Sequence, residues 1–165
     1  MALVEIGDLP GLLPAKARLL GLDLGSKTIG LAISDSRLAL ASPLETIKRR
    51  KFTEDAKALK RLCGEREVGA LVVGLPVNMD GSEGPRCQSV RDFARNLVEI
   101  AGLDLPIAFW DERLSSAAVE RFLVEEADMT RKRRGEVVDK MAAGFILQGA
   151  LDAIAGQGQS RGEPT

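Results

Sequence analysis

The chain has 165 residues, enough for one domain with a full hydrophobic core and too few for two ordinary domains. Its formal net charge is -1, so any binding to nucleic acid must depend on local basic patches rather than on a global field. The sequence contains no histidine, which excludes a Ser-His-Asp triad, a histidine general base and a His-ligated zinc site.

The composition also bears on the compartment. The two cysteines, Cys63 and Cys87, lie far apart and match no metal-binding spacing, which is typical of a reduced, cytoplasmic protein. The N-terminus lacks a basic segment followed by an apolar core, and no apolar run approaches the length of a membrane span. We therefore expect a cytoplasmic protein with no signal peptide and no membrane partner.

The first third of the chain predicts a meander of strands. Residues 1–16 are punctuated by Gly and Pro and are weakly patterned, so we expect a flexible terminus there. Two apolar runs between Leu19 and Ser34, joined through Gly25-Ser26-Lys27, predict two buried strands in a hairpin. The segment Leu38–Ile47 predicts a third strand, in which Pro43 indicates a sheet edge or a β-bulge.

The rest of the chain alternates helices with strands. The expected elements are, in order, a helix beginning at Thr53 and ending at Gly64, a strand over Val68–Leu75, a helix reaching Ile100, a strand over Leu105–Trp110, a short helix over Leu114–Glu126 and a helix over Glu136–Ile154. This alternation implies parallel crossovers, so we expect an α/β fold with a mixed five-stranded sheet and helices on both faces. The expected domain spans residues 17–155, and residues 156–165 form a second flexible terminus.

Asp23 is the first candidate for chemistry. Strand alternation places it on one side of its strand together with Gly21 and Gly25, while leucines occupy the other side. A buried carboxylate is costly unless a positive group meets it. We expect the flanking glycines to leave room for such a group, which could be a metal ion, a phosphate-bound metal or an arginine. The alternative is that Asp23 caps a turn or pairs internally.

Other acidic residues occupy positions that are unusual for surface carboxylates. Asp111 and Glu112 directly follow an apolar strand, and Asp139 lies in the expected first turn of an apolar helix, on the face of Ala143 and Ile146. Each has an alternative role as a cap, a surface charge or a helix-dipole partner. Converging carboxylates are the ligands that Mg²⁺ or Mn²⁺ prefers. Two such ions about 4 Å apart stabilise the attacking and leaving oxygens in phosphodiester cleavage.

Several basic residues could contact phosphates. Lys27 lies at the hairpin tip, Arg113 follows Glu112, and the basic run Arg131–Arg134 immediately precedes the helix of Asp139. Lys27 and the basic run are alternatively solvated surface, and Arg113 alternatively forms a salt bridge with a neighbouring acid. Within this basic run, we expect Arg131 and Arg134 to bind nucleic acid.

Four segments together resemble a known family. They are Gly21–Asp35, Gly74–Pro76 with Asp80–Glu83, Asp111–Ser116, and Val138–Asp139 with Ala142–Ala143. In this order, over about Arg18 to Leu151, the sequence resembles the YqgF (RuvX) family of resolvase-like nucleases in the ribonuclease H-like superfamily. The resemblance implies a ribonuclease H-like fold, a divalent metal and a role in maturing the 5′ end of pre-16S ribosomal RNA. Kinship with Holliday-junction resolvases makes a DNA nuclease the alternative.

The resemblance also implies the site residues. It matches Asp23, Glu112 and Asp139 to the catalytic, metal-binding acids, and the residues leave open whether Asp111 or Glu112 is the ligand. The expected partners are ribosomal precursor RNA or branched DNA, bound by a monomer or a homodimer. Two further interpretations are an actin- or sugar-kinase-like ATPase, suggested by Asp23–Thr28, and a non-catalytic RNA-binding module. The ATPase requires a second domain for which the chain is too short.

Overall fold

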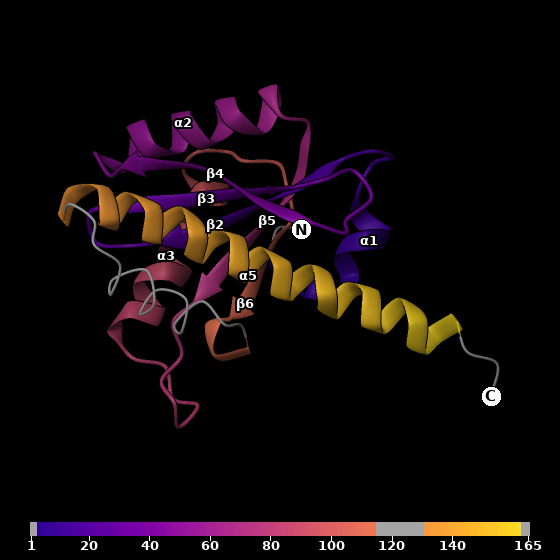
Figure 1. Cartoon of the computed structure of the whole chain (residues 1–165). Helices are drawn as coiled ribbons and strands as arrows, with labels where there is room; N and C mark the ends of the chain where they lie inside the picture. The colour runs from indigo at the N-terminus through magenta and orange to yellow at the C-terminus, as the bar shows by residue number, and fades with distance from the viewer. Residues whose placement is uncertain (1–2, 115–130, 163–165) are drawn as a thin grey trace.

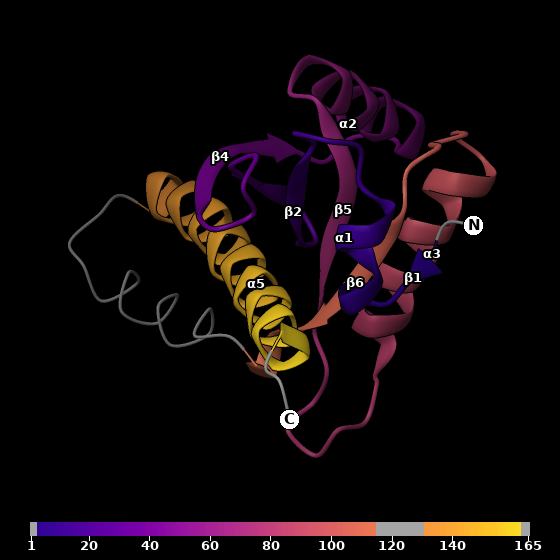
Figure 2. The same ribbon diagram turned by 90° about the vertical axis from the view of Figure 1, so that its right-hand side faces the viewer.

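The computed structural model describes residues 3–114 and 131–162, with side chains described over 3–114 and 140–156. In the described residues one sheet has six strands in the order β1-β6-β5-β2-β3-β4; Figure 1 labels β2 to β6, and Figure 2 labels β1. The strands are β1 Leu3–Val4, β2 Arg18–Leu24, β3 Thr28–Ser34, β4 Ala41–Lys48, β5 Val68–Leu75 and β6 Ile107–Asp111. Strands β1, β6, β5 and β2 are parallel to one another, and β3 and β4 complete an antiparallel meander with β2.

Helices cover both faces of this sheet. They are η1 Ile6–Asp8, α1 Leu9–Leu12, α2 Phe52–Glu65, α3 Pro85–Glu99, η2 Glu112–Leu114 and α5 Arg131–Gly162. Figure 2 shows α5 on one face of the sheet and α2 with α3 on the other. Among the described residues no helix is long and apolar enough to cross a membrane. The expected mixed sheet between helical layers is therefore confirmed, with one strand more than predicted.

Strand β2 lies at the centre of the sheet and is buried on both faces. Its side chains alternate, so Leu20, Leu22 and Leu24 enter the core under α2 and α3, whereas Leu19 enters the core under α5. Gly21 also faces α5, and a Cβ atom there would lie 2.8 Å from the Cβ of Leu147. This glycine therefore lets α5 pack closely, which corrects the expectation that it leaves room for a ligand of Asp23.

The ends of the chain differ from expectation. The predicted flexible leader instead forms β1, η1 and α1, and Leu9 is completely buried in the core under α5. These elements are too short to produce a clear periodicity in the sequence. At the other end, α5 already includes Arg131 and continues to Gly162, so residues 156–162 are helical. The helix predicted over Leu114–Glu126 falls on residues 115–130, outside the described residues, apart from Leu114 in η2.

The meander at the other edge of the sheet behaves as predicted. Strand β4 is an edge strand, and its pairing with β3 shifts register opposite Pro43. Proline lacks the N–H that a ladder needs, so both the edge position and the irregularity have the same cause. The N-cap of α2 is Lys51 rather than Thr53, and the Lys51 side chain makes no capping hydrogen bond.

Candidate active site

Asp23 lies at the carboxyl end of β2, between β5 and β3. Its side chain is 6% exposed, and its partner across the β2–β3 ladder is Gly30. Because Leu19 and Gly21 face α5, strand alternation directs Asp23 toward the same face. The structure thus holds one buried carboxylate on a rigid central strand, at the sheet end where parallel strands terminate.

Glu112 follows β6, which is separated from β2 by β5, and its side chain lies on the α5 face of the sheet. It opens η2 directly after β6, and its Oε1 lies 2.8 Å from the position that a Cβ on Gly74 would occupy. Val73 pairs with Leu22, so Gly74 follows beside Asp23 on the neighbouring strand. Adjacent strands are about 4.8 Å apart, so the Glu112 carboxylate lies over the β5 residue that neighbours Asp23.

Asp111 points the other way. In β6, Ala108 and Trp110 belong to the core under α5, and Asp111 therefore lies on the α3 face with Phe109. Its carboxylate accepts hydrogen bonds from the guanidinium of Arg113, the shortest being 2.7 Å from Nη2 to Oδ2. This hydrogen bonding holds the pKa of Asp111 below its usual range. Of the two acids left open by the sequence, Glu112 is the one that lies on the α5 face of the sheet, as Asp23 does.

Asp139 is placed by its backbone alone, because its side chain lies outside the described ones. It sits one turn before Ala143, whose carbonyl oxygen would lie 3.2 Å from a Cβ on Gly21. Gln148 of α5 bonds the start of β4 at Ala41, and Gly144 lies over Pro43, so α5 runs opposite to β4 and β2. The turn that carries Asp139 therefore lies toward the carboxyl end of β2, where Asp23 is found.

The sequence predicted Asp139 in the first turn of its helix, and this prediction is wrong. Since α5 already includes Arg131, Asp139 lies about two turns inside it. The helix N-terminus therefore lies too far away for the helix-dipole role that was one alternative for Asp139, because that effect fades within the first turn. The apolar face expected around it is confirmed, since Ala143 and Ile146 are both fully buried.

The basic candidates are spread over different segments. Lys27 is exposed at the β2–β3 turn, and its carbonyl accepts a 2.8 Å hydrogen bond from the Arg49 backbone N–H. Arg113 forms the ion pair with Asp111 and also donates to the carbonyl of Met79. Arg131 and Arg134 belong to the first turn of α5, and their side chains lie outside the described ones. The structure therefore gives Arg113 the salt bridge that was its alternative role.

The donors at this site suit a hard divalent cation. Asp23 and Glu112 offer only carboxylate oxygens, which Mg²⁺ and Mn²⁺ prefer. Within the described side chains, no group of three or more His, Cys, Asp or Glu could hold a metal. Gly74 belongs to a segment that carries the family resemblance, but its role in making room for Glu112 was not predicted; a glycine inside a buried strand was the available signal.

Most of the chain matches a known protein family. The model of the RuvX family, described as a Holliday junction resolvase, matches residues 17–153. The chain belongs to the RuvX family. One relative, from Phenylobacterium zucineum (strain HLK1), is 61% identical over 154 residues, spanning 93% of this chain and 98% of the relative. Another, from Roseobacter denitrificans (strain ATCC 33942 / OCh 114), is 60% identical over 154 residues, spanning 93% and 94%. Both are named "Putative pre-16S rRNA nuclease".

Solved structures confirm the fold of this RuvX protein. T. thermophilus RuvC in complex with Holliday junction substrate matches with a TM-score of 0.53 at 15% identity, over 85% of this chain and 96% of that chain. The yeast mitochondrial Holliday junction resolvase Ydc2 matches with a TM-score of 0.53 at 12% identity, over 94% and 85%. The fold is the expected ribonuclease H-like one. The family and its relatives make this RuvX protein a nuclease, a hydrolase of phosphodiester bonds.

Proposed function

We propose that this RuvX protein is a metal-dependent endonuclease that processes the 5′ end of pre-16S rRNA in the cytoplasm, as a step of ribosome biogenesis. The observation that carries the proposal is the convergence of the Asp23 and Glu112 carboxylates on the α5 face of the sheet. The names of the relatives at about 60% identity support ribosomal precursor RNA as the substrate.

In the proposed mechanism, the acids act as ligands for Mg²⁺ or Mn²⁺. Asp23 and Glu112 hold the metal, and Asp139 supplies a further carboxylate from α5. A divalent ion held by these residues would supply Lewis acidity toward the attacking water and the phosphate. Asp23 is held rigidly because β2 is paired on both sides, and Glu112 is held over β5 because Gly74 has no side chain. Lys27, Arg131 and Arg134 contribute charge for phosphate contacts.

The test is cleavage of a 5′-extended 16S rRNA transcript in Mg²⁺ or Mn²⁺, compared with cleavage of a four-way DNA junction. We expect the transcript to be cut, with all activity lost in excess chelator and in the Asp23→Asn variant. Asp104→Asn is the matched control, because Asp104 is exposed and lies on the loop before β6. It should retain wild-type activity.

The outcomes separate the remaining functions. Preferential cutting of the DNA junction would favour the resolvase function that the family description names. Transcript binding without cleavage, unchanged by Asp23→Asn, would favour a non-catalytic RNA-binding module. Cleavage that persists in excess chelator would contradict the metal-dependent mechanism itself.

A further inference from the structure

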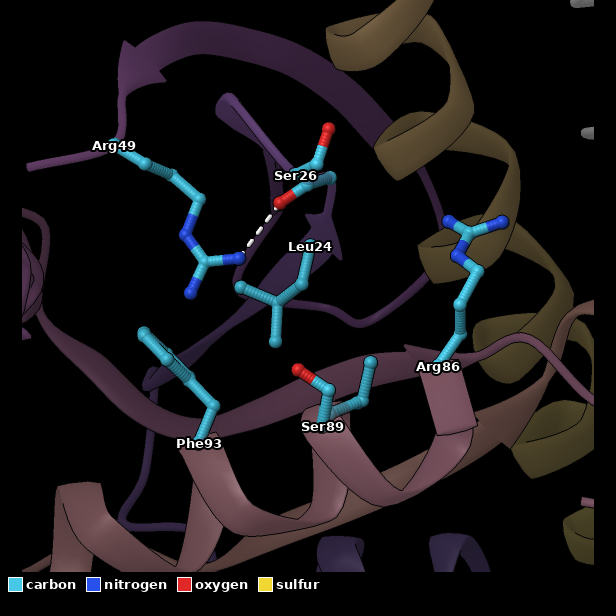
Figure 3. A pocket seen from close by; sticks show the side chains of 8 residues that line it. Leu24, Ser26, Arg49, Arg86, Ser89 and Phe93 are labelled. Atoms are coloured by element: carbon cyan, nitrogen blue, oxygen red, sulfur yellow. Dashed lines mark hydrogen bonds between the residues drawn. The ribbon is translucent and has the colours of Figure 1, made fainter. Parts of the chain in front are cut away.

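A small pocket opens beside the candidate active site, on the other face of the sheet. It lies between the β2–β3 turn, the segment after β4 and the first three turns of α3, and its volume is about 120 Å³ (Figure 3). The residues that shape its chemistry are Gly25, Ser26, Arg49, Arg86, Ser89 and Phe93. Three segments distant in sequence thus build one cavity.

The pocket is cationic. Arg49 and Arg86 stand on opposite sides of it, with Ser26 between them (Figure 3). The hydroxyls of Ser26 and Ser89 add hydrogen-bond donors, and none of the residues lining the cavity is acidic. Two guanidinium groups with hydroxyl donors and no lining carboxylate match the chemistry of a phosphate oxyanion.

Arg49 is positioned before any ligand arrives. Its Nη1 donates a 2.7 Å hydrogen bond to the carbonyl of Gly25, and its guanidinium lies 5.4 Å from the centre of the Phe93 ring. Phe93 is itself packed edge-to-face on Phe52, with ring centres 5.4 Å apart. A guanidinium has five N–H donors, so the bond to Gly25 leaves others to meet a ligand. Holding the cation in place reduces the entropy lost on binding.

Arg86 is the more adaptable of the two cations. It is exposed near the start of α3, and within the described part of the chain the structure gives it neither an ion pair nor a hydrogen bond. The nearby Arg91, by contrast, is paired with Glu83 at 2.7 Å. Ser89 follows Arg86 by three residues, which places both on one side of the helix. Arg86 can therefore close on an anion without breaking an existing contact.

The position of the pocket relative to Asp23 indicates which phosphate it would bind. Leu24 lines it, and the preceding residue is Asp23, whose side chain faces the opposite side of the sheet. We propose that the pocket binds a backbone phosphate of the nucleic-acid strand whose scissile phosphate lies at Asp23 and Glu112, an inference that rests on the proposed function. A layer packed on one face of a sheet lies about 10 Å from the sheet. The phosphates of one nucleic-acid strand in a duplex are spaced about 3.4 Å apart along the helix axis. The bound phosphate is then a few nucleotides from the cleavage point, and it fixes the register of the strand.

The first experiment measures binding without catalysis. The full chain is titrated in excess chelator with a single-stranded RNA 12-mer of fixed sequence, with and without a 5′-phosphate, over a range of salt concentrations. We expect Arg86→Gln to weaken binding about tenfold and to reduce the salt slope by about one unit, equally for both RNAs. Arg86→Lys should restore part of the affinity. Arg61→Gln on α2 is the matched control, because Arg61 is also exposed and helical.

The results decide between the possibilities. An unchanged affinity and salt slope for Arg86→Gln would overturn the proposal, as would a wild-type chain that does not bind the 12-mer. If Arg86→Gln loses affinity only for the 5′-phosphorylated RNA, the pocket binds a terminal phosphate rather than a backbone phosphate, and the proposal is overturned. Because the titration contains no metal, its outcome does not depend on whether the protein cleaves RNA. In the cleavage assay, Arg86→Gln should raise KM with little change in kcat.

Discussion

Gly74 is the residue whose replacement tests the geometry of the site most directly. In Gly74→Ala, the new Cβ would lie 2.8 Å from Oε1 of Glu112 and 2.5 Å from Cδ1 of Ile146. Ordinary contacts begin near 3.4 Å, so the carboxylate must move by about 0.6 Å. Metal–ligand distances hold within about 0.2 Å, so this displacement is too large for an intact site. We expect Mn²⁺ affinity to fall at least tenfold and cleavage to fall with it.

The same substitution has a smaller effect on folding. Crowding in a packed core costs about 1–3 kcal/mol, and replacing a strand glycine with alanine regains about 0.5–1 kcal/mol. The net loss of about 0–2.5 kcal/mol corresponds to a fall in Tm of at most about 10 °C for a chain of this length. Gly69→Ala is the matched control, because its Cβ would lie 2.7 Å from both Ala17 and Leu13. That position is on the same strand but about 16 Å from Gly74.

The assay combines thermal unfolding with calorimetric titration of Mn²⁺. Both alanine variants should lose similar stability in chelator, since both crowd the core. Saturating Mn²⁺ should raise the Tm of wild type and Gly69→Ala, whereas Gly74→Ala should gain less at the same metal concentration. If Gly74→Ala binds Mn²⁺ as tightly as Gly69→Ala does, then Glu112 is not a metal ligand and the placement of the site is wrong.

Three further predictions follow from the remaining residues. Asp139→Asn should reduce metal-dependent cleavage about a hundredfold or more, while the stability of the protein in chelator stays level or rises. Asp152→Asn, on the same helix, is the control. If Asp139→Asn unfolds while Asp152→Asn stays folded and active, Asp139 has a structural role. Replacing Arg131 and Arg134 with Gln should weaken RNA binding for all sequences and flatten its salt dependence, whereas an unchanged slope would identify a solvated surface. Burial raises the pKa of Cys63 to about 11, so its thiol stays protonated at pH 8 and iodoacetamide should label it only after denaturation; rapid labelling of the folded chain would contradict this burial.

Local patterns in the sequence were sufficient for much of this protein. The alternation around Asp23 predicted which strand residues face each side, because side-chain direction in a strand depends only on neighbours in the chain. The proline at position 43 predicted both an edge strand and an irregular register, since a missing N–H acts at that residue alone. The acids Asp23, Glu112 and Asp139 were also recognisable as candidates, from their apolar surroundings and from the family resemblance.

Tertiary structure decided the features that depend on distant segments. Which of Asp111 and Glu112 lies on the α5 face depends on where β6 ends and on the space over Gly74, which belongs to another strand. Asp139 lies outside the first turn because α5 already includes Arg131, and the two residues of β1 form a strand by pairing with β6. The cationic pocket needs the β2–β3 turn, Arg49 and α3 to meet. Register and packing between such segments are set by burial of the whole core, which no local window of sequence contains.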